Sequence, residues 1–202
     1  MKQHHSASSR HDRHGARQPE RFNVEKAALM DDPQRFEYLP PSHIISLLKL
    51  APGMLVVDYG TGTGTYAIQI ASAHPEVTVV AYDEQPQMLE HLRAKPQAKL
   101  SNIRIALPEQ VTEFLGRADR VLALNVLHEL GDEALKEMRE LLAADGIALV
   151  IDWNAEIERP YGPPREHTYA LSQAVERMET AGFSIERLPA LRYHFVFRAM
   201  RR

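Results

Sequence analysis

The 202-residue sequence has no cysteine. This absence excludes disulfides, thiolate metal ligands and cysteine nucleophiles, and it fits the reducing cytoplasm in which we expect the protein. No apolar run approaches the roughly 20 residues that cross a bilayer. The polar, basic first residues also lack the apolar core of a secretory signal. We therefore expect no membrane partner.

A large excess of one charge sign is also missing. Lysine and arginine total 24 and aspartate and glutamate total 27, giving a net charge of -3 and a pI near 6.4. This balance gives no electrostatic reason to expect nucleic acid as a partner. The hydrophobic fraction of 44% and the charged fraction of 25% are typical of one globular domain with short attachments. We expect a small-molecule substrate and a monomer or homodimer.

Residues 1–20 have no aliphatic stripe but contain His4, His5, His11 and His14. Such a polar segment cannot bury enough surface to offset its ordering entropy, which predicts a disordered His- and Arg-rich tail. The alternative is a histidine metal site, but the spacing matches no compact tetrahedral pattern. We favour the tail and predict no metal site.

Residues 21–51 predict a helical cover ahead of the main domain. Val24 to Met30 indicates a short helix that Asp31-Asp32-Pro33 should end, because proline disfavours helix in the residue before it. Pro40-Pro41 then introduces a second helix, with Ser42 as its N-cap. The apolar side of this helix comprises Ile44, Ile45, Leu47, Leu48 and Leu50.

From residue 52 to residue 202, strand and helix patterns alternate. Apolar runs typical of strands buried on both faces lie at 54–58, 77–82, 103–106, 121–127 and 147–153. Helical stretches lie near 64–74, 86–94, 132–144 and 172–182, the third with Asp132 as its cap and Gly146 at its end. Two β-like segments close the chain near 183–188 and 193–199. The pattern predicts an α/β fold with a Rossmann-like doubly wound, mostly parallel seven-stranded sheet and a C-terminal antiparallel hairpin.

A glycine-rich loop, Gly60-Thr61-Gly62-Thr63-Gly64, directly follows the first of these strands. Ligands of a doubly wound sheet bind at the carboxyl ends of its strands, and glycines let the backbone approach a ligand closely. Such a loop could serve a dinucleotide, a phosphate or packing alone. Thr65 stands where a dinucleotide fingerprint has Gly or Ala, and the first lysine after the loop is Lys95. The register therefore favours a ligand without a pyrophosphate.

Two carboxylates accompany the loop. Asp83 ends the second strand 19 residues after Gly64, where it can accept hydrogen bonds from both hydroxyls of a ribose. Alternatively, Asp83 or Glu84 only caps the helix that follows. Asp58 lies in an apolar strand, where a carboxylate is costly unless paired. Its partner is either a ligand's ammonium group or a structural hydrogen bond to the loop.

These residues resemble class I S-adenosylmethionine-dependent methyltransferases. Residues 56–64 are similar to the first motif of that family, 81–89 to its acidic second motif, 118–130 to its fourth-strand motif and 141–149 to its turn into strand five. The resemblance covers about residues 22–200 and is closest to the small-molecule members. It implies S-adenosyl-L-methionine as the cofactor, with a binding set of Asp58, Gly60, Thr61, Gly62, Gly64, Asp83, Glu84, Ala106, Leu107 and Asn125. Relatives usually contact adenine through a polar residue after strand three. Here that segment is short and apolar, which leaves the contact to backbone groups of Ala106 and Leu107.

Methyl transfer from a sulfonium is an in-line displacement, which needs a general base only if the nucleophile arrives protonated. The fourth strand ends beside the expected position of the methyl group, which makes His128 the candidate base or substrate contact. The alternative is a histidine hydrogen-bonded to the local backbone. In the long loop that follows the fifth strand, Trp153 and Tyr161 suit an aromatic acceptor, whereas Arg159, Arg165 and His167 suit an acidic one.

The sequence thus implies a methyltransferase that acts on a small-molecule acceptor. One alternative is a non-catalytic protein that binds S-adenosylmethionine or adenosine, because the motifs describe cofactor binding rather than chemistry. The other is an NAD-dependent oxidoreductase, which Thr65 and the lack of a Tyr-x-x-x-Lys pair disfavour.

Overall fold

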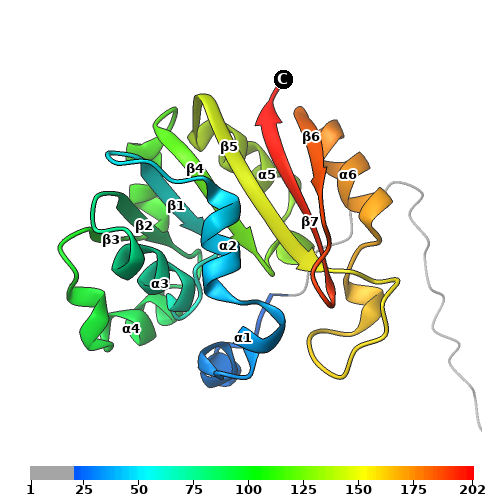
Figure 1. Cartoon of the computed structure of the whole chain (residues 1–202), viewed down its shortest axis with the longest axis horizontal. Helices are drawn as coiled ribbons and strands as arrows, with labels where there is room; N and C mark the ends of the chain where they lie inside the picture. Colours follow the sequence, from blue (N-terminus) through cyan, green and yellow to red (C-terminus); the bar gives the residue numbers. More distant parts are fainter. Residues whose placement is uncertain (1–20) are drawn as a thin grey trace, which may run out of the picture.

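The computed structural model describes residues 21–202 and has a seven-stranded sheet in the order β3-β2-β1-β4-β5-β7-β6 (Figure 1). The strands are β1 (Leu55–Tyr59), β2 (Thr78–Tyr82), β3 (Ile103–Ala106), β4 (Ala118–Leu124), β5 (Leu142–Trp153), β6 (Phe183–Leu188) and β7 (His194–Arg201). Neighbouring strands are parallel except at β7, which runs antiparallel to both β5 and β6. The predicted fold class, including the C-terminal hairpin, is confirmed.

The central strands are buried on both faces. Val56 and Val57 are successive residues of β1, so their side chains point to opposite faces, and both are fully buried. In the sheet, Val57 lies between Val80 of β2 and Val121 of β4. Full burial of a side chain of this kind stabilises the fold by roughly 1.5–3 kcal/mol. Uninterrupted apolar runs in the sequence therefore correspond to interior strands.

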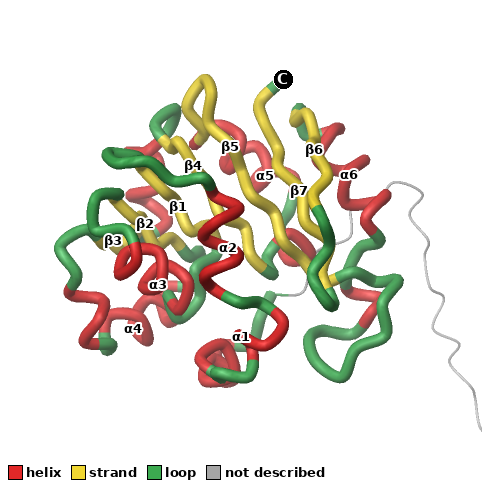
Figure 2. The backbone as a smooth tube through the Cα atoms, in the orientation of Figure 1, coloured by secondary structure: helices red, strands yellow, loops and turns green. Residues whose placement is uncertain are grey.

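Helices cover both faces of the sheet (Figures 1 and 2). The helices α2 (Pro41–Leu48), α3 (Thr65–Ala73) and α4 (Pro86–Arg93) lie on one face, and α5 (Asp132–Leu141) and α6 (Leu171–Thr180) lie on the other. Leu48 and Ile70 pack into the core of the first face, and Met138 and Met178 into that of the second. The chain leaves β1 toward one face and β4 toward the other, which creates a crevice between the ends of these two neighbouring strands.

The N-terminal residues lie at the carboxyl ends of the strands, where the loop after β5 also lies (Figure 2). They form η1 (Val24–Asp31), a short 3-10 helix that ends at Asp31 as predicted, and then the single turn α1 (Arg35–Tyr38). The predicted tail with its four histidines lies outside the described residues. Within residues 21–202, no helix is long and apolar enough to cross a membrane.

The predicted caps of two helices are wrong. Helix α2 begins at Pro41 with Pro40 in the N-cap position, so Ser42 lies inside the first turn. Proline suits the first helical position because its φ is already helical and its missing N–H is not needed there. Helix α5 has Gly131 in the N-cap position, and Asp132 is its first helical residue rather than its cap.

The far end of α5 also differs from the prediction. The helix ends at Leu141 rather than near residue 144, because Leu142 already pairs with Ala118 of β4. Gly146 ends no helix and instead lies within β5. A Cβ at Gly146 would lie 2.5 Å from the Ala118 carbonyl oxygen, so close strand contact explains this glycine.

Candidate functional site

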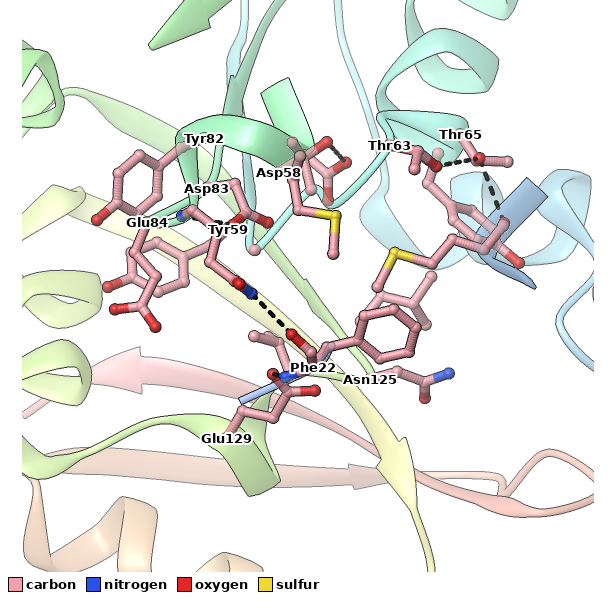
Figure 3. A pocket seen from close by; sticks show the side chains of 18 of the residues that line it. Phe22, Asp58, Tyr59, Thr63, Thr65, Tyr82, Asp83, Glu84, Asn125 and Glu129 are labelled. Carbon is pink, nitrogen blue, oxygen red and sulfur yellow. Dashed lines mark hydrogen bonds between the residues drawn. The ribbon is translucent and has the colours of Figure 1, made fainter. Parts of the chain in front are cut away.

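A pocket lies at the crevice between the ends of β1 and β4 (Figure 3). Its wall combines the loop after β1, the residues after β2, those after β4 and the N-terminal segment. The predicted residues on this wall are Asp58, Gly60, Thr61, Asp83, Glu84 and Asn125. Residues on the wall that were not predicted include Phe22, Met30, Arg35, Tyr59, Tyr82, Val126 and Glu129.

Four predicted cofactor-binding residues are not among those that line the pocket. Gly62 lies in the loop and contributes through its backbone, as described below. Gly64 occupies the N-cap position of α3. Ala106 is buried at the end of β3, and Leu107 precedes the next 3-10 turn. The adenine contact through these last two residues stays a prediction.

The glycine loop is shaped by its neighbours on two sides. Gly60 and Gly62 have φ angles of 73° and 56°, in the left-handed region that L side chains rarely adopt. A Cβ at Gly60 would lie 2.5 Å from a methyl group of Val126, and one at Gly62 would collide with the sulfur of Met30. The loop therefore packs against the end of β4 and against the N-terminal segment, and larger residues would displace one or the other.

Asp83 joins the glycine loop to the segment after β2. Its Oδ2 accepts a hydrogen bond from the Gly62 backbone N–H at 2.8 Å, and its Oδ1 accepts one from Gln85 N–H at 2.9 Å. The residue is only 7% exposed, and burial raises the pKa of its carboxyl group. Each carboxylate oxygen can accept a second hydrogen bond. Capping the turn at Gln85 and binding a ligand are therefore compatible roles for this carboxylate.

Asp58 is almost fully buried yet reaches the pocket. The Thr61 hydroxyl donates to its Oδ2 at 2.6 Å, which is the structural hydrogen bond considered as one alternative. Burial nevertheless raises the pKa of Asp58 to about 6, since this bond offsets only part of the lost hydration. A cationic ligand group would stabilise the charged form further.

Asn125 directly follows β4 and has a strained backbone. Its φ of 55° is uncommon for a residue other than glycine. Its side chain lies at the pocket (Figure 3), and its Oδ1 is buried without a hydrogen-bond partner among the described residues. An unsatisfied buried acceptor costs about 1–3 kcal/mol. The strain and the unpaired oxygen together indicate a ligand that donates an N–H or O–H at this point.

Residues 21–32, called the N-terminal strap from here on, cross the pocket. At one end, the Phe22 N–H donates to Oε2 of Glu129 at 2.9 Å, and the Gln85 side chain donates to the Phe22 carbonyl at 3.3 Å. Arg21 forms an ion pair with Glu84 at 2.8 Å. The strap is thus attached to residues that follow β2 and β4.

At its other end the strap is attached to the glycine loop through Asp31. Oδ1 of Asp31 accepts hydrogen bonds from the hydroxyls of Thr63 and Thr65 at 2.7 and 2.6 Å and from the Lys95 ammonium at 2.6 Å. Partial burial alone would raise the pKa of Asp31, but these three donors hold it below its ordinary value. The pocket has a volume of about 80 Å³.

His128 lies behind the pocket wall rather than on it. Its Nδ1 is 2.9 Å from Oδ1 of the buried Asp152, and its backbone N–H donates to Oδ2 of the same residue at 2.8 Å. Burial by itself lowers the pKa of His128, but the Asp152 carboxylate outweighs this and raises it. The partner of the ring is therefore a carboxylate on β5, not the local backbone of the alternative prediction. The role of His128 as a base stays a prediction.

Glu129, next to His128 in sequence, does line the pocket. Its Oε1 lies 3.4 Å from Nε2 of His128, and burial raises its pKa to about 7. The sequence pattern gives no signal for it, because a short 3-10 turn (Leu127–Glu129) decides which of these neighbours faces the pocket.

The charge of the wall is mainly negative. Arg35 is the cation among the lining residues, against the carboxylates of Asp58, Asp83, Glu84 and Glu129. Its guanidinium lies 5.6 Å from the Tyr66 ring centroid and donates to the Met30 carbonyl at 2.5 Å. Such a wall suits a ligand with cationic groups and hydroxyls that also carries one anionic group.

A family model described as a methyltransferase domain matches residues 57–148, a span that contains the glycine loop, Asp83 and Asn125. The crystal structure of an S-adenosylmethionine-dependent methyltransferase from Aquifex aeolicus aligns with 90% of this chain and 100% of its own, with a TM-score of 0.81 and 26% sequence identity. Residues 57–148 therefore belong to a methyltransferase domain family, and the fold of the chain is similar to that of S-adenosylmethionine-dependent methyltransferases.

Two curated methyltransferases are similar to this chain over part of their length. The ubiquinone/menaquinone biosynthesis C-methyltransferase of Geotalea uraniireducens is 28% identical over 117 residues, which are 54% of this chain and 50% of that protein. The trans-aconitate 2-methyltransferase of Methylobacterium radiotolerans is 32% identical over 114 residues, 55% of this chain and 42% of that protein. The chain thus covers half or less of these two relatives.

The pocket also has an aromatic side. Tyr59 and Tyr82 both line it, with ring centroids 4.9 Å apart, and the Tyr59 hydroxyl donates to Oε1 of Glu137 at 2.7 Å. Tyr82 ends a predicted buried strand and Tyr59 directly follows one, and aromatic residues at such positions ordinarily indicate core. Only the positions of the strand ends in the sheet show that their rings reach a ligand site.

Proposed function

We propose that this chain binds S-adenosylmethionine in the pocket and transfers its methyl group to a small-molecule acceptor. The observation that carries the proposal is the unpaired Oδ1 of Asn125 on an acidic wall beside the glycine loop. An empty acceptor among carboxylates fits a ligand that is cationic and rich in donors. When bound, the cofactor supplies an electrophilic methyl group on a sulfonium.

The wall residues divide between the parts of such a ligand by their chemistry. Asp83 and Glu84 accept hydrogen bonds from the ribose hydroxyls. Asp58 and Asn125 receive the ammonium group, and Arg35 receives the carboxylate. The Thr61 hydroxyl keeps Asp58 oriented through its 2.6 Å bond. Charge-assisted bonds of this type are the strong ones in a site of low dielectric.

The chain's part in the transfer is to align the acceptor and exclude water. The strap with Phe22 covers the pocket, and Glu129 accepts a proton if the nucleophile arrives with one, while His128 behind it stabilises the Glu129 carboxylate before the transfer. The names of two relatives refer to ubiquinone/menaquinone biosynthesis and to trans-aconitate, which supports a small-molecule acceptor. Neither a nucleic acid nor a membrane partner is part of the proposal.

Calorimetric titration tests the binding step. We expect S-adenosylmethionine and S-adenosylhomocysteine to bind with low-micromolar to submillimolar Kd and NAD not to compete. Asp58→Asn should weaken binding at least about tenfold. Asp145→Asn changes an exposed acid on β5 and should leave binding unchanged. Tighter binding of NAD would overturn the proposal. Labelled methyl transfer to molecules of a small-molecule extract tests catalysis, and binding without transfer would indicate the non-catalytic alternative.

A further inference from the structure

An aromatic cluster adjoins the pocket at the end of β5. It comprises Tyr38, Trp153, Tyr161, Tyr193 and His194, contributed by α1, β5, the loop after β5 and the start of β7. The Tyr38 ring stacks on that of Tyr161 with centroids 5.6 Å apart, and the Trp153 and His194 rings are 4.1 Å apart. These contacts bring together residues more than 100 positions apart in sequence, with Tyr161 exposed and the other four residues buried.

Two connections make the cluster continuous with the cofactor pocket. Arg35 lines the pocket, and Tyr38, one helical turn later in α1, belongs to the cluster. Asn125 N–H donates to the Ile151 carbonyl of β5 at 2.8 Å, two residues before Trp153. An acceptor held at the cluster would therefore lie next to the end of β4.

Arg159 lies over this cluster with unused hydrogen-bonding capacity. Its guanidinium carbon is 5.1 Å from the Trp153 ring centroid. One Nη donates to the Pro163 carbonyl at 2.8 Å and the other to the Asn154 carbonyl at 3.5 Å. Its Nε is buried and has no partner, and no carboxylate pairs with it within residues 21–202. Burial and the positive charge of Arg165 lower the pKa of Arg159, and the Asp152 carboxylate offsets this only in part.

Arg165, a second arginine of this loop, differs in its surroundings. Arg165 is exposed, and its Nε donates to the Ala155 carbonyl at 2.7 Å. It therefore has its Nε satisfied and its charge in water. The structure thus singles out Arg159 between these two arginines.

We infer that Arg159 recognises the methyl acceptor, and that this acceptor carries a carboxylate attached to an aromatic or other flat apolar group. This inference rests on the proposed function. The planar guanidinium binds a carboxylate through its free N–H groups, and the exposed Tyr161 and the neighbouring rings contact the flat part of the molecule. An anion beside Arg159 also satisfies the buried Nε.

The single tryptophan of the chain reports on this site, because Trp153 lies directly beneath Arg159. Tryptophan fluorescence would be titrated with benzoate and with benzamide, which keeps the ring but lacks the charge, in the presence and absence of S-adenosylhomocysteine. We expect saturable quenching by benzoate and at least about tenfold weaker binding of benzamide. Equal binding of the two probes, or no saturable binding of benzoate, would overturn the inference.

Variants assign the effect to one side chain. Arg159→Gln should weaken benzoate binding at least about tenfold, Arg159→Lys should bind at an intermediate level because it keeps the charge but not the planar fork, and Arg165→Gln should match the wild type. Wild-type affinity in a folded Arg159→Gln protein would refute the role of Arg159. If Arg159→Gln does not fold, the comparison of Arg159→Lys with Arg165→Gln decides, and equal affinity in these two also refutes it.

Calorimetry with S-adenosylhomocysteine on the same samples separates the two proposals. Cofactor binding without benzoate binding overturns only the acceptor inference. If S-adenosylhomocysteine does not bind to the wild type, the proposed function is overturned, even where Arg159-dependent binding of benzoate is found.

Discussion

Replacing Asp83 by alanine should weaken both the fold and cofactor binding. The carboxylate holds the N–H groups of Gly62 and Gln85 through bonds of 2.8 and 2.9 Å. Hydrogen bonds to a charged group contribute roughly 1.5–3 kcal/mol each. Burial, which raises the pKa of Asp83, offsets part of that sum. We expect the free energy of unfolding to fall by about 2–4 kcal/mol. If the same carboxylate accepts the ribose hydroxyls, cofactor affinity should also fall by about 2–4 kcal/mol, roughly 30- to 1,000-fold.

Denaturant unfolding and calorimetry measure the two effects of this change separately. For Asp83→Asn, the free energy of unfolding and the cofactor affinity should both lie between those of Asp83→Ala and the wild type, because the amide keeps one acceptor but turns a donor toward the other N–H. Asp145→Ala is the control. A cofactor analogue without the 2′-hydroxyl should show little further loss on Asp83→Ala, since both changes remove one contact. Strictly additive losses would show that Asp83 does not touch the ribose. An unchanged free energy of unfolding would refute its role in joining the two loops.

Three further changes test the loop, the strap and the buried acid. Gly62→Val should abolish detectable cofactor binding in a folded protein, whereas Gly116→Val, equally left-handed but with open space around it, should bind normally by calorimetry. Asp31→Asn should speed both hydrogen exchange in the strap and association of the cofactor, because it weakens the bond to Lys95 that holds the strap closed. Asp32→Asn is the control and should change neither rate. Equal rates in the two variants would contradict the closing role of Asp31. The raised pKa of Glu129, about 7 against an ordinary 4.5, means that the folded state binds its proton more tightly. The free energy of unfolding should therefore fall by up to about 3 kcal/mol as pH rises from 4.5 through 7, and urea unfolding of Glu129→Gln should show a flatter profile; an identical profile would show that another group titrates.

The sequence by itself determined the sheet, the position of the glycine loop and the acid after the second strand. These features depend on local patterns. Uninterrupted apolar runs such as Val56-Val57 can be buried only inside a sheet, and the alternation of strands with helices predicts parallel pairing. Because parallel strands end at one edge, Gly60 and Asp83 were expected to meet there, and they line the same pocket.

Helix ends were less predictable because tertiary pairing decides them. Leu142 has good helical surroundings, yet its pairing with Ala118 draws it into β5. Propensity and capping preferences describe an isolated segment, and a strand that offers backbone partners outweighs them.

Only the tertiary structure decided which polar side chains meet. The Phe22 N–H and the Glu129 carboxylate that receives it are 107 residues apart, and Asp31 reaches Thr63 and Lys95, which are 32 and 64 residues away. Nothing local to Arg159 shows that its Nε lacks an acceptor, since that follows from how the loop after β5 folds over Trp153. Hydrophobic periodicity is a property of neighbouring residues, whereas the partner of a buried charge depends on the whole fold, because water is excluded only where distant segments close on each other.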